Sequence, residues 1–445
     1  MKNLTLLFAV VLLFTTSGFS QGCLPEGINL LSQEDIDNFQ TNFPGCTEIE
    51  GSVYIRGVDI TNLSGLIVLE SVGGNLDISY CDSLISLNGL NQITSIKGQL
   101  NIFETGISSL EGLEGLDSIS GSFYIALNNN LISAEGLDNL KFVGQEMYIL
   151  QNPLLENFEG LNSLATVGGY LRFGDNNNLK SIRGFSNLSS VYGSLWIEFN
   201  PVLTDVSGFA SIDSIGEQLK FTTNASLQDF SGMNVSTVGV GVSIYGNSSL
   251  LRLEGLNNLR SVGQDMVISK NDALLDLNAL DNLVNIQVIG IVDNDNLLSL
   301  EGLNNIDTGS LSALFILFNP LLSICDAESV CEFISDPSNS ASVNNNAPGC
   351  NNLAEIEAAC QVGVPELSDT PAVSIYPNPA SDFISISGIG LNNKICVTFF
   401  NQLGLITGKT ELTSERVDVS NLEKGLYIAE IKSNSWVTRQ KFIIN

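Results

Sequence analysis

Glutamate recurs at one position of this sequence, immediately before a glycine, at Glu111, Glu135, Glu159, Glu254 and Glu301. Paired carboxylates are the acid and base of glycoside hydrolysis, and a β-helix can align carboxylates on adjacent turns. Some polysaccharide-cleaving enzymes are β-helices, so that class stays open as an alternative. Because these glutamates occupy one place in a repeat, however, we interpret them as part of the repeat and predict no catalytic residue among them.

The sequence contains no histidine, which removes Ser-His-Asp and Cys-His catalysis and most catalytic zinc sites. Two Asp- and Asn-rich segments, 175–178 and 293–296, resemble calcium ligands only loosely and lack the glycine–aspartate nonapeptide of calcium-binding β-helices. We therefore expect a protein that is not an enzyme and that holds no metal or cofactor.

A second group of residues has the chemistry of a binding surface. In successive short strands, the residue between two apolar ones is Tyr124, Tyr148, Arg172 and then Trp196, and Tyr245 follows a later strand. Strands of consecutive turns lie about 4.8 Å apart, so the first four would form one stripe. Exposed aromatics with an arginine are typical of protein-binding hot spots, and aromatic faces also suit sugar rings. The alternative is that the aromatics only stack to stabilise a sheet.

An internal repeat must position these residues. Asparagine recurs, almost always after 23 or 24 residues, at Asn128, Asn152, Asn176, Asn200, Asn224, Asn247, Asn271, Asn294 and Asn319. Glycine keeps the same step at Gly65, Gly89, Gly112, Gly136, Gly160, Gly184, Gly208, Gly232, Gly255 and Gly302, with Ala279 in the one gap. A fixed period in the twenties indicates a stacked solenoid, and we expect about twelve turns over residues 46–331.

Each repeat contains a strand of the form apolar–x–apolar, followed by the asparagine. Alternation points the two apolar residues inward, and the asparagine should turn inward at the corner, where stacked copies form a ladder that satisfies backbone groups. Cys81 takes the asparagine place in an early copy and is predicted to be a buried thiol. The glycines, as in Glu111-Gly112-Leu113 and Glu301-Gly302-Leu303, suit a turn with positive φ. No sustained helical periodicity is found, so the convex side should be strand and turn.

The repeats resemble leucine-rich repeats and, more closely, the receptor L-domain family found in insulin and epidermal growth factor receptors. The likeness rests on segments such as 119–125 and 110–113, and it covers residues 46–331. It implies a right-handed parallel β-solenoid used for extracellular recognition. The sequence differs from the receptors in its larger number of turns, its few cysteines and its lack of a kinase or spanning helix, so signalling is not implied.

Six of the eight cysteines bracket the repeats, at Cys23, Cys46, Cys325, Cys331, Cys350 and Cys360. Exported solenoids must seal the ends of their cores, and disulfides in short caps can do this. We expect a bridge between Cys23 and Cys46 in an N-terminal cap, residues 21–45. Two more are expected in a C-terminal cap, residues 332–361, where three pairings stay open.

Residues 1–20 have the charged start, apolar centre and small residues of a signal peptide, so the protein is expected to be exported. The formal net charge is −30, which repels polyphosphate and makes nucleic acid a poor partner. No other stretch approaches the length of a membrane span.

After a linker at residues 362–372, the composition changes and short alternating strands predict a small antiparallel β-sandwich over residues 373–445. This segment resembles the type A C-terminal sorting domain of the type IX secretion system. The resemblance is carried by Tyr376-Pro377-Asn378-Pro379-Ala380, by residues 400–404, by residues 422–427 with Gly425 and Tyr427, and by Lys441-Phe442-Ile443. It implies an outer-membrane surface or extracellular location and contact with the secretion machinery. The terminal Ile444-Asn445 lacks the basic residue often found in that family.

Together these observations predict a mostly β protein that recognises an extracellular protein or glycan through the solenoid face, as an adhesin does. A polysaccharide-active β-helix enzyme and a structural surface spacer are the alternatives.

Overall fold

The computed structural model describes residues 22–362, 373–388, 395–401, 405–412, 414, 416–433 and 437–445. They divide into two compact units, Met1–Gly363 and Val364–Asn445. The predicted signal peptide and residues 363–372 of the predicted linker lie outside the described residues, as do residues 402–404 of the sorting motif.

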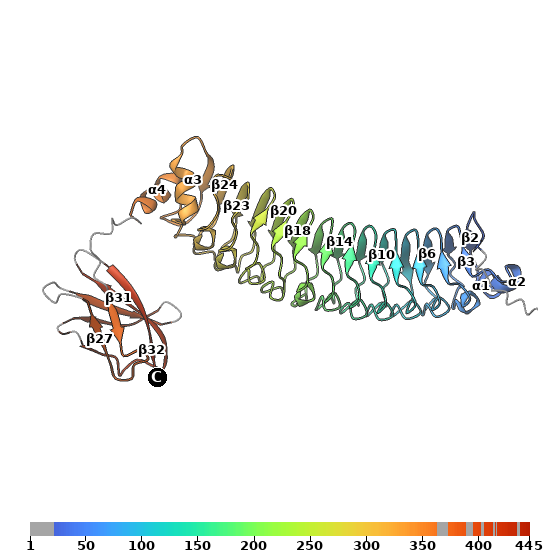
Figure 1. Cartoon of the computed structure of the whole chain (residues 1–445), viewed down its shortest axis with the longest axis horizontal. Coiled ribbons are helices and arrows are strands. Elements are labelled where there is room, and N and C mark those ends of the chain that lie inside the picture. The colour runs from blue at the N-terminus through green and yellow to red at the C-terminus, as the bar shows by residue number, and fades with distance from the viewer. Residues whose placement is uncertain are drawn as a thin grey trace, which may run out of the picture. The chain divides into compact units, whose positions relative to one another are not determined.

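Two parallel sheets run along the N-terminal unit, and each of the first eleven coils contributes one strand to each sheet (Figure 1). The long sheet has 14 strands. They are β2 (Ile28–Leu30), β4 (Val53–Ile55), β6 (Leu76–Cys81), β8 (Leu100–Thr105), β10 (Phe123–Ala126), β12 (Met147–Leu150), β14 (Leu171–Gly174), β16 (Leu195–Glu198), β18 (Gln218–Thr222), β20 (Gly241–Tyr245), β22 (Asp265–Ser269), β23 (Val288–Val292), β24 (Ala313–Leu317) and β25 (Ser340–Asn344).

The narrow sheet has 11 strands of two residues each. They are β1 (Gly22–Cys23), β3 (Glu48–Ile49), β5 (Ser71–Val72), β7 (Ser95–Ile96), β9 (Ser118–Ile119), β11 (Phe142–Val143), β13 (Thr166–Val167), β15 (Ser190–Val191), β17 (Ser214–Ile215), β19 (Thr237–Val238) and β21 (Ser261–Val262). The predicted parallel β-solenoid is confirmed. Its sheets extend beyond residues 46–331, because β1 and β2 precede that range and β25 follows it.

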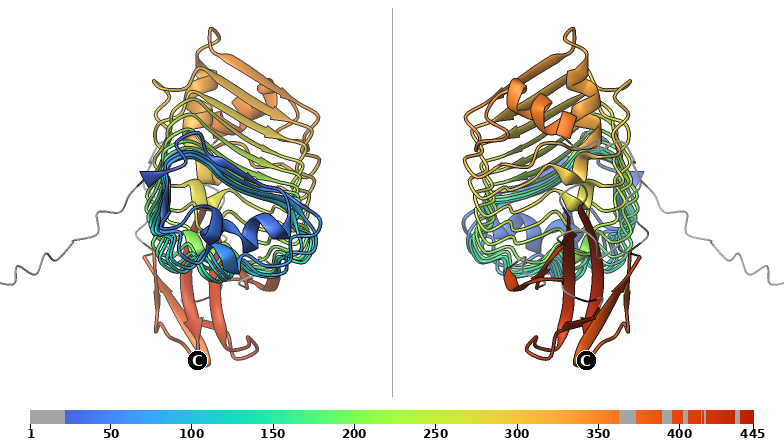
Figure 2. Two further views of the ribbon diagram at one scale, coloured as in Figure 1. Left: turned by 90° about the vertical axis from the view of Figure 1, so that its right-hand side faces the viewer. Right: turned by 90° about the vertical axis from the view of Figure 1, so that its left-hand side faces the viewer.

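The remaining side of the coils consists of turns and four short 3₁₀ helices. These are η1 (Ser64–Leu66), η2 (Ser207–Phe209), η3 (Asn278–Leu280) and η4 (Glu301–Leu303). The α-helices among the described residues lie at the two ends of the solenoid: α1 (Gln33–Asp37) and α2 (Phe39–Asn42) at one, α3 (Glu328–Ser335) and α4 (Leu353–Val362) at the other. Figure 2 looks along the axis and shows these helices across the ends of the stacked coils, where they cover an otherwise open core.

The asparagines form the expected ladder and are fully buried. The Asn152 N–H donates to Oδ1 of Asn176 at 3.0 Å, and its Nδ2 donates to the carbonyls of Leu150 and Ile125 at 3.0 and 3.2 Å. Each amide thus links three consecutive coils. The residue before each asparagine has positive φ, for example 56° at Gln151, so the corner holds an uncommon backbone conformation that the ladder stabilises.

The glycine column is only partly explained by positive φ. Gly112 has φ 108°, as predicted, but Gly302 lies in η4 outside the left-handed region. A Cβ on Gly302 would lie 1.8 Å from the carbonyl oxygen of Leu277, and one on Gly208 would lie 2.0 Å from that of Ile182. The close approach of the preceding coil, in addition to the turn, therefore requires glycine at this position.

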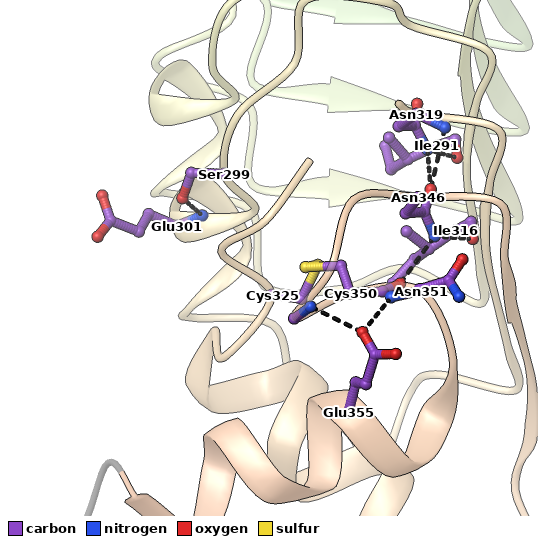
Figure 3. The surroundings of a disulfide bond; sticks show 11 residues. Ile291, Ser299, Glu301, Ile316, Asn319, Cys325, Asn346, Cys350, Asn351 and Glu355 are labelled. Atoms are coloured by element: carbon purple, nitrogen blue, oxygen red, sulfur yellow. Dashed lines mark hydrogen bonds between the residues drawn. A yellow bond between two sulfur atoms is a disulfide. The ribbon is translucent and has the colours of Figure 1, made fainter. Parts of the chain in front are cut away.

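Three disulfides close the ends of the solenoid: Cys23–Cys46, Cys325–Cys350 and Cys331–Cys360. At the C-terminal end, Asn346 continues the ladder beyond Asn319 and donates to the carbonyls of Ile316 and Cys350 (Figure 3). Glu355 on α4 accepts hydrogen bonds from the backbone N–H groups of Gly349 and Asn351 at 2.7 and 3.1 Å.

At the N-terminal end of the ladder, residues other than asparagine occupy the ladder position. Thr105 donates to Oδ1 of Asn128 at 2.7 Å, and Cys81 is buried with its thiol near the carbonyls of Ile55 and Ser79. Burial raises the pKa of the Cys81 thiol.

The C-terminal unit contains two antiparallel sheets around one core. A three-stranded sheet holds β26 (Ser374–Tyr376), β27 (Phe383–Ser387) and β30 (Arg416–Asp418). A four-stranded sheet has the order β29 (Ile406–Glu411), β28 (Cys396–Phe400), β31 (Gly425–Lys432), β32 (Val437–Ile444). Phe399, Tyr427 and Phe442 pack in the core, with ring centroids 5.7 and 5.8 Å apart. Cys396 is only half-buried, because alternation turns it to the other face of β28.

Candidate ligand-binding face of the long sheet

The parallel register of the long sheet brings the predicted stripe residues together. Tyr124 on β10 pairs with Tyr148 on β12, which pairs with Arg172 on β14 and then Trp196 on β16. Lys220 and Ser243 continue the row on β18 and β20. All lie between buried neighbours, so their side chains share the outer face of the sheet. We call Tyr124, Tyr148, Arg172, Trp196 and Lys220 the outer row.

The two tyrosines of the outer row contact each other. Their ring centroids lie 5.0 Å apart with an interplanar angle of 45°. Desolvation by burial raises the pKa of Tyr148, with the neighbouring Tyr124 adding to the effect, so its hydroxyl stays protonated at neutral pH. The pair therefore places two aromatic rings and two phenol hydroxyls side by side on this face.

Trp196 is the most crowded member of the outer row. The ring of Tyr170 stacks on it with centroids 5.5 Å apart and an interplanar angle of 22°. The Lys220 ammonium lies 4.6 Å from its centroid and the Arg172 guanidinium 5.7 Å. Its Nε1 is buried without a hydrogen-bond partner among the described residues. Trp196 is therefore a packed platform, held by a ring and two cations, rather than a freely exposed side chain.

The two cations of the outer row have different surroundings. Arg172 donates from Nε to the carboxylate of Glu198 at 2.6 Å, so its charge is balanced within the sheet. For Lys220, no ion pair is found in the described part of the chain. Lys220 is therefore the cation of this row that can serve an incoming ligand without losing a carboxylate partner.

Two carboxylates border the outer row on the side where the strands begin. Glu146 accepts a hydrogen bond from the Ser122 hydroxyl at 2.6 Å, and Glu217 accepts one from the Ser194 hydroxyl at 3.1 Å. The charge of Glu217, its hydrogen bond and, to a smaller extent, Glu146 raise the pKa of Tyr170. Tyr170, Glu146 and Glu217 are not among the residues predicted from the sequence. Tyr170 could have been predicted, because it lies two residues before Arg172 and strand alternation places both side chains on the same face.

Tyr245 lies apart from the outer row. It pairs with Thr222 on β18, so it is displaced two residues along the strand and two strands beyond Trp196. It is 40 % exposed, and the Lys270 ammonium lies 5.7 Å from its ring centroid. Tyr245 thus belongs to the same face but not to the same contiguous surface.

A shallow hollow of about 290 Å³ follows the ladder corner beside the outer row. It is lined by Leu127, Asn129, Gln151, Pro153, Asp175 and Asn177. These residues follow β10, β12 and β14, which carry Tyr124, Tyr148 and Arg172. The hollow therefore extends the same surface with amide and carboxylate groups.

The glutamates of the repeat position lie elsewhere, on the side of turns and 3₁₀ helices. Glu301 is exposed in η4, and its N–H donates to the hydroxyl oxygen of Ser299 at 3.1 Å (Figure 3). Among the described residues, no group of three or more His, Cys, Asp or Glu side chains could hold a metal ion.

Comparison with known proteins identifies the C-terminal unit. Residues 374–445 match the family described as the secretion system C-terminal sorting domain. This match indicates export to the cell surface or the extracellular space, in agreement with the location predicted from the sequence. Among the described residues, no helix is long and apolar enough to cross a membrane.

The chain is also similar to a protein named Beta-agarase D from Zobellia galactanivorans, with 30% identity over 82 residues. The alignment covers 18% of this chain, and the chain spans 17% of the length of that relative. This similarity overturns the prediction that the protein is not an enzyme. That prediction depended on the missing histidine, which excludes imidazole chemistry but leaves carboxylate and tyrosine chemistry available.

Proposed function

We propose that the solenoid binds a polysaccharide outside the cell through the outer row and the polar groups beside it. The observation that carries the proposal is the unbroken register Tyr124–Tyr148–Arg172–Trp196 on four consecutive strands. Stacked aromatic faces and cations at one outward position form an elongated surface along the solenoid axis, which matches the shape of a chain ligand better than that of a small molecule.

The chemistry beside the row supports a sugar. Aromatic ring faces suit the apolar sides of pyranoses, and the hydroxyl groups of a sugar need both hydrogen-bond donors and hydrogen-bond acceptors. Tyr148 supplies a neutral hydroxyl, and the carboxylates of Glu146 and Glu217 supply acceptors on the same face. The similarity to a protein named for agarase activity also favours a polysaccharide over a protein ligand.

Binding can be tested by titrating purified protein with agarose oligosaccharides and a panel of other soluble polysaccharides in a calorimeter. We expect Tyr148→Ala and Trp196→Ala each to weaken binding about tenfold or more, as removal of a buried aromatic anchor does. Ser243→Ala, in the same outward position beyond the aromatics, is the matched control and should bind normally. Unchanged affinity in both aromatic variants, with folding intact, would show that the row only stabilises the sheet.

A polysaccharide-active enzyme is the second candidate, favoured by the same similarity. Glu217 and Glu146 both influence Tyr170, which makes these three the groups to test for acid–base chemistry. If the face is catalytic, Glu217→Gln and Glu146→Gln should abolish release of reducing ends from the polysaccharide that binds. Glu301 lies on the side of turns and 3₁₀ helices, so Glu301→Gln should leave the release of reducing ends unchanged. Equal activity in all four proteins would exclude this site.

A further inference from the structure

The outer face of the four-stranded sheet in the C-terminal unit carries apolar side chains that the core does not use. Along β31, Tyr427, Ala429 and Ile431 point into the core, so Leu426 and Ile428 point outward. On β32, Phe442 and Ile444 are buried, whereas Ile443 is 41% exposed. Alternation thus separates a core set from an outer set within the same sorting-domain sequence.

Cross-strand register places the outer set together. Ile406 pairs with Phe400, Phe400 with Ile428, and Ile428 with Lys441, which is one row across all four strands. Leu426 pairs with Ile443 in the adjacent row. Ile406 is 64% exposed and Leu426 is 38% exposed. We call Phe400, Ile406, Leu426, Ile428 and Ile443 the apolar patch.

Basic side chains border the apolar patch. Lys441 ends its main row, and the next row contains Lys409, Thr398, Glu430 and Arg439. Glu430 is engaged by Arg439 at 2.8 Å, so Lys409 and Lys441 provide positive charge. This border stands out in a chain of net charge −30, and it implies a partner surface that carries carboxylates.

We propose that the apolar patch is the surface by which this unit docks onto the secretion machinery. The occupant is a protein of that machinery with an apolar strip bordered by acidic side chains. Isolated exposed apolar residues need no explanation, but a contiguous patch with a charged border is typical of a binding surface. The proposal concerns transport and is independent of the ligand that the solenoid binds.

Asn378 of the sorting motif positions this surface rather than forming it. Its Oδ1 accepts from the N–H of Ile443 at 2.9 Å, and its Nδ2 donates to the carbonyl of Lys441 at 3.3 Å. Ala380 also donates to the carbonyl of Ile443 at 2.7 Å. The motif near the start of the unit therefore fixes the end of β32, which carries Ile443 of the apolar patch and Lys441 of its border.

The proposal can be tested with the full chain produced in a bacterium that has a type IX secretion system. Leu426→Ser combined with Ile443→Ser removes the exposed apolar pair, and Lys441→Glu alone reverses one border charge. We expect at least a tenfold fall in surface-exposed plus released protein for the double variant and a severalfold fall for Lys441→Glu. Protein that fails to leave should accumulate in the periplasm in a protease-resistant, folded form. Lys432→Glu, an exposed charge reversal at the other end of β31, is the matched control and should be exported normally.

Each outcome decides the proposal. Wild-type export of both patch variants overturns it, and so does normal export accompanied by loss of a dimer in size-exclusion chromatography, which would assign the patch to a second copy of this chain. If the double variant is degraded, Lys441→Glu gives the answer, because an exposed side chain can be changed without unfolding the sheet. Retained protein that still binds polysaccharide separates this proposal from that for the solenoid.

Discussion

The two units of this chain differ in charge and in how each buries its core. Residues 373–445 contain seven Lys or Arg and six Asp or Glu, a net of +1, so the other residues carry −31 of the total of −30. The solenoid stacks parallel strands of successive coils, whereas the C-terminal unit pairs antiparallel strands around one core. The solenoid therefore depends on contact between neighbours at every step, and the sorting unit depends on closure of a single core.

The contrast extends to polar groups. In the solenoid the core is lined by a row of fully buried asparagines, each hydrogen-bonded to the next coil. The C-terminal unit places its polar contacts at edges, such as Asn378 against β32 and the Tyr427 hydroxyl on the Glu423 carbonyl. A damaged coil should therefore affect its neighbours on both sides, while damage in one unit should leave the other unit folded.

The largest effect is expected for Asn200→Ala in the middle of the ladder. Asn200 donates to the carbonyls of Phe173 and Glu198, and its Oδ1 accepts from Asn176. Removing it leaves at least two buried backbone groups unsatisfied, a loss of roughly 2–5 kcal/mol in the free energy of unfolding. Urea unfolding measured by circular dichroism checks this. Asn187→Ala, which removes one exposed hydrogen bond to Asn162, should lose less than about 1 kcal/mol.

Gly208→Ala tests how closely the coils must approach. Its Cβ would lie 2.0 Å from the carbonyl oxygen of Ile182, so we expect a loss of about 1–3 kcal/mol from overpacking. Gly290→Ala, whose Cβ would have its nearest neighbour in the Val267 side chain at 3.6 Å, is the control and should be nearly neutral. Equal stability of the two variants would show that a coil accommodates a methyl group in η2, as the coil of Ala279 does in η3.

A smaller, pH-dependent effect is expected at the C-terminal cap. Hydrogen bonds from the N–H groups of Asn351 and Gly349 lower the pKa of Glu355 below its usual 4.5. A carboxyl group whose pKa is lowered on folding stabilises the fold above the unfolded pKa and loses this contribution as the pH falls through the folded pKa. The melting temperature of Glu355→Gln should therefore lie below that of the wild type near neutral pH, and the gap should narrow under acid conditions. A gap that does not change with pH would contradict this assignment.

The smallest effect is expected from removing residues 364–445. Because the two units have separate cores, the melting temperature of the solenoid should change by less than about 1 °C. Differential scanning calorimetry of the full and shortened chains checks this. A shift of several degrees would show that the units stabilise each other.

Much of the solenoid was predictable because its sequence repeats. The asparagine and glycine columns indicated the parallel coils, the ladder and the outward position of Tyr124, Tyr148, Arg172 and Trp196, since period and alternation fix which face a residue occupies. The antiparallel strands of the C-terminal unit were predictable for the same local reason. Cys81 could be placed at the ladder by counting from Ile78.

Three-dimensional contacts decided the rest. Gly302 is required by the carbonyl of Leu277, which lies in the coil before it, and no local turn signal reports that approach. Trp196 is surrounded by Tyr170, Arg172 and Lys220 from two neighbouring coils, so its packing depends on side chains about 24 residues away in either direction. The pairing of Cys325 with Cys350 likewise follows from the path of α3 and α4, which the irregular cysteine spacing leaves open. The sequence determined which residues face outward, because that is a local property of a strand, whereas their mutual contacts arise only when the coils stack.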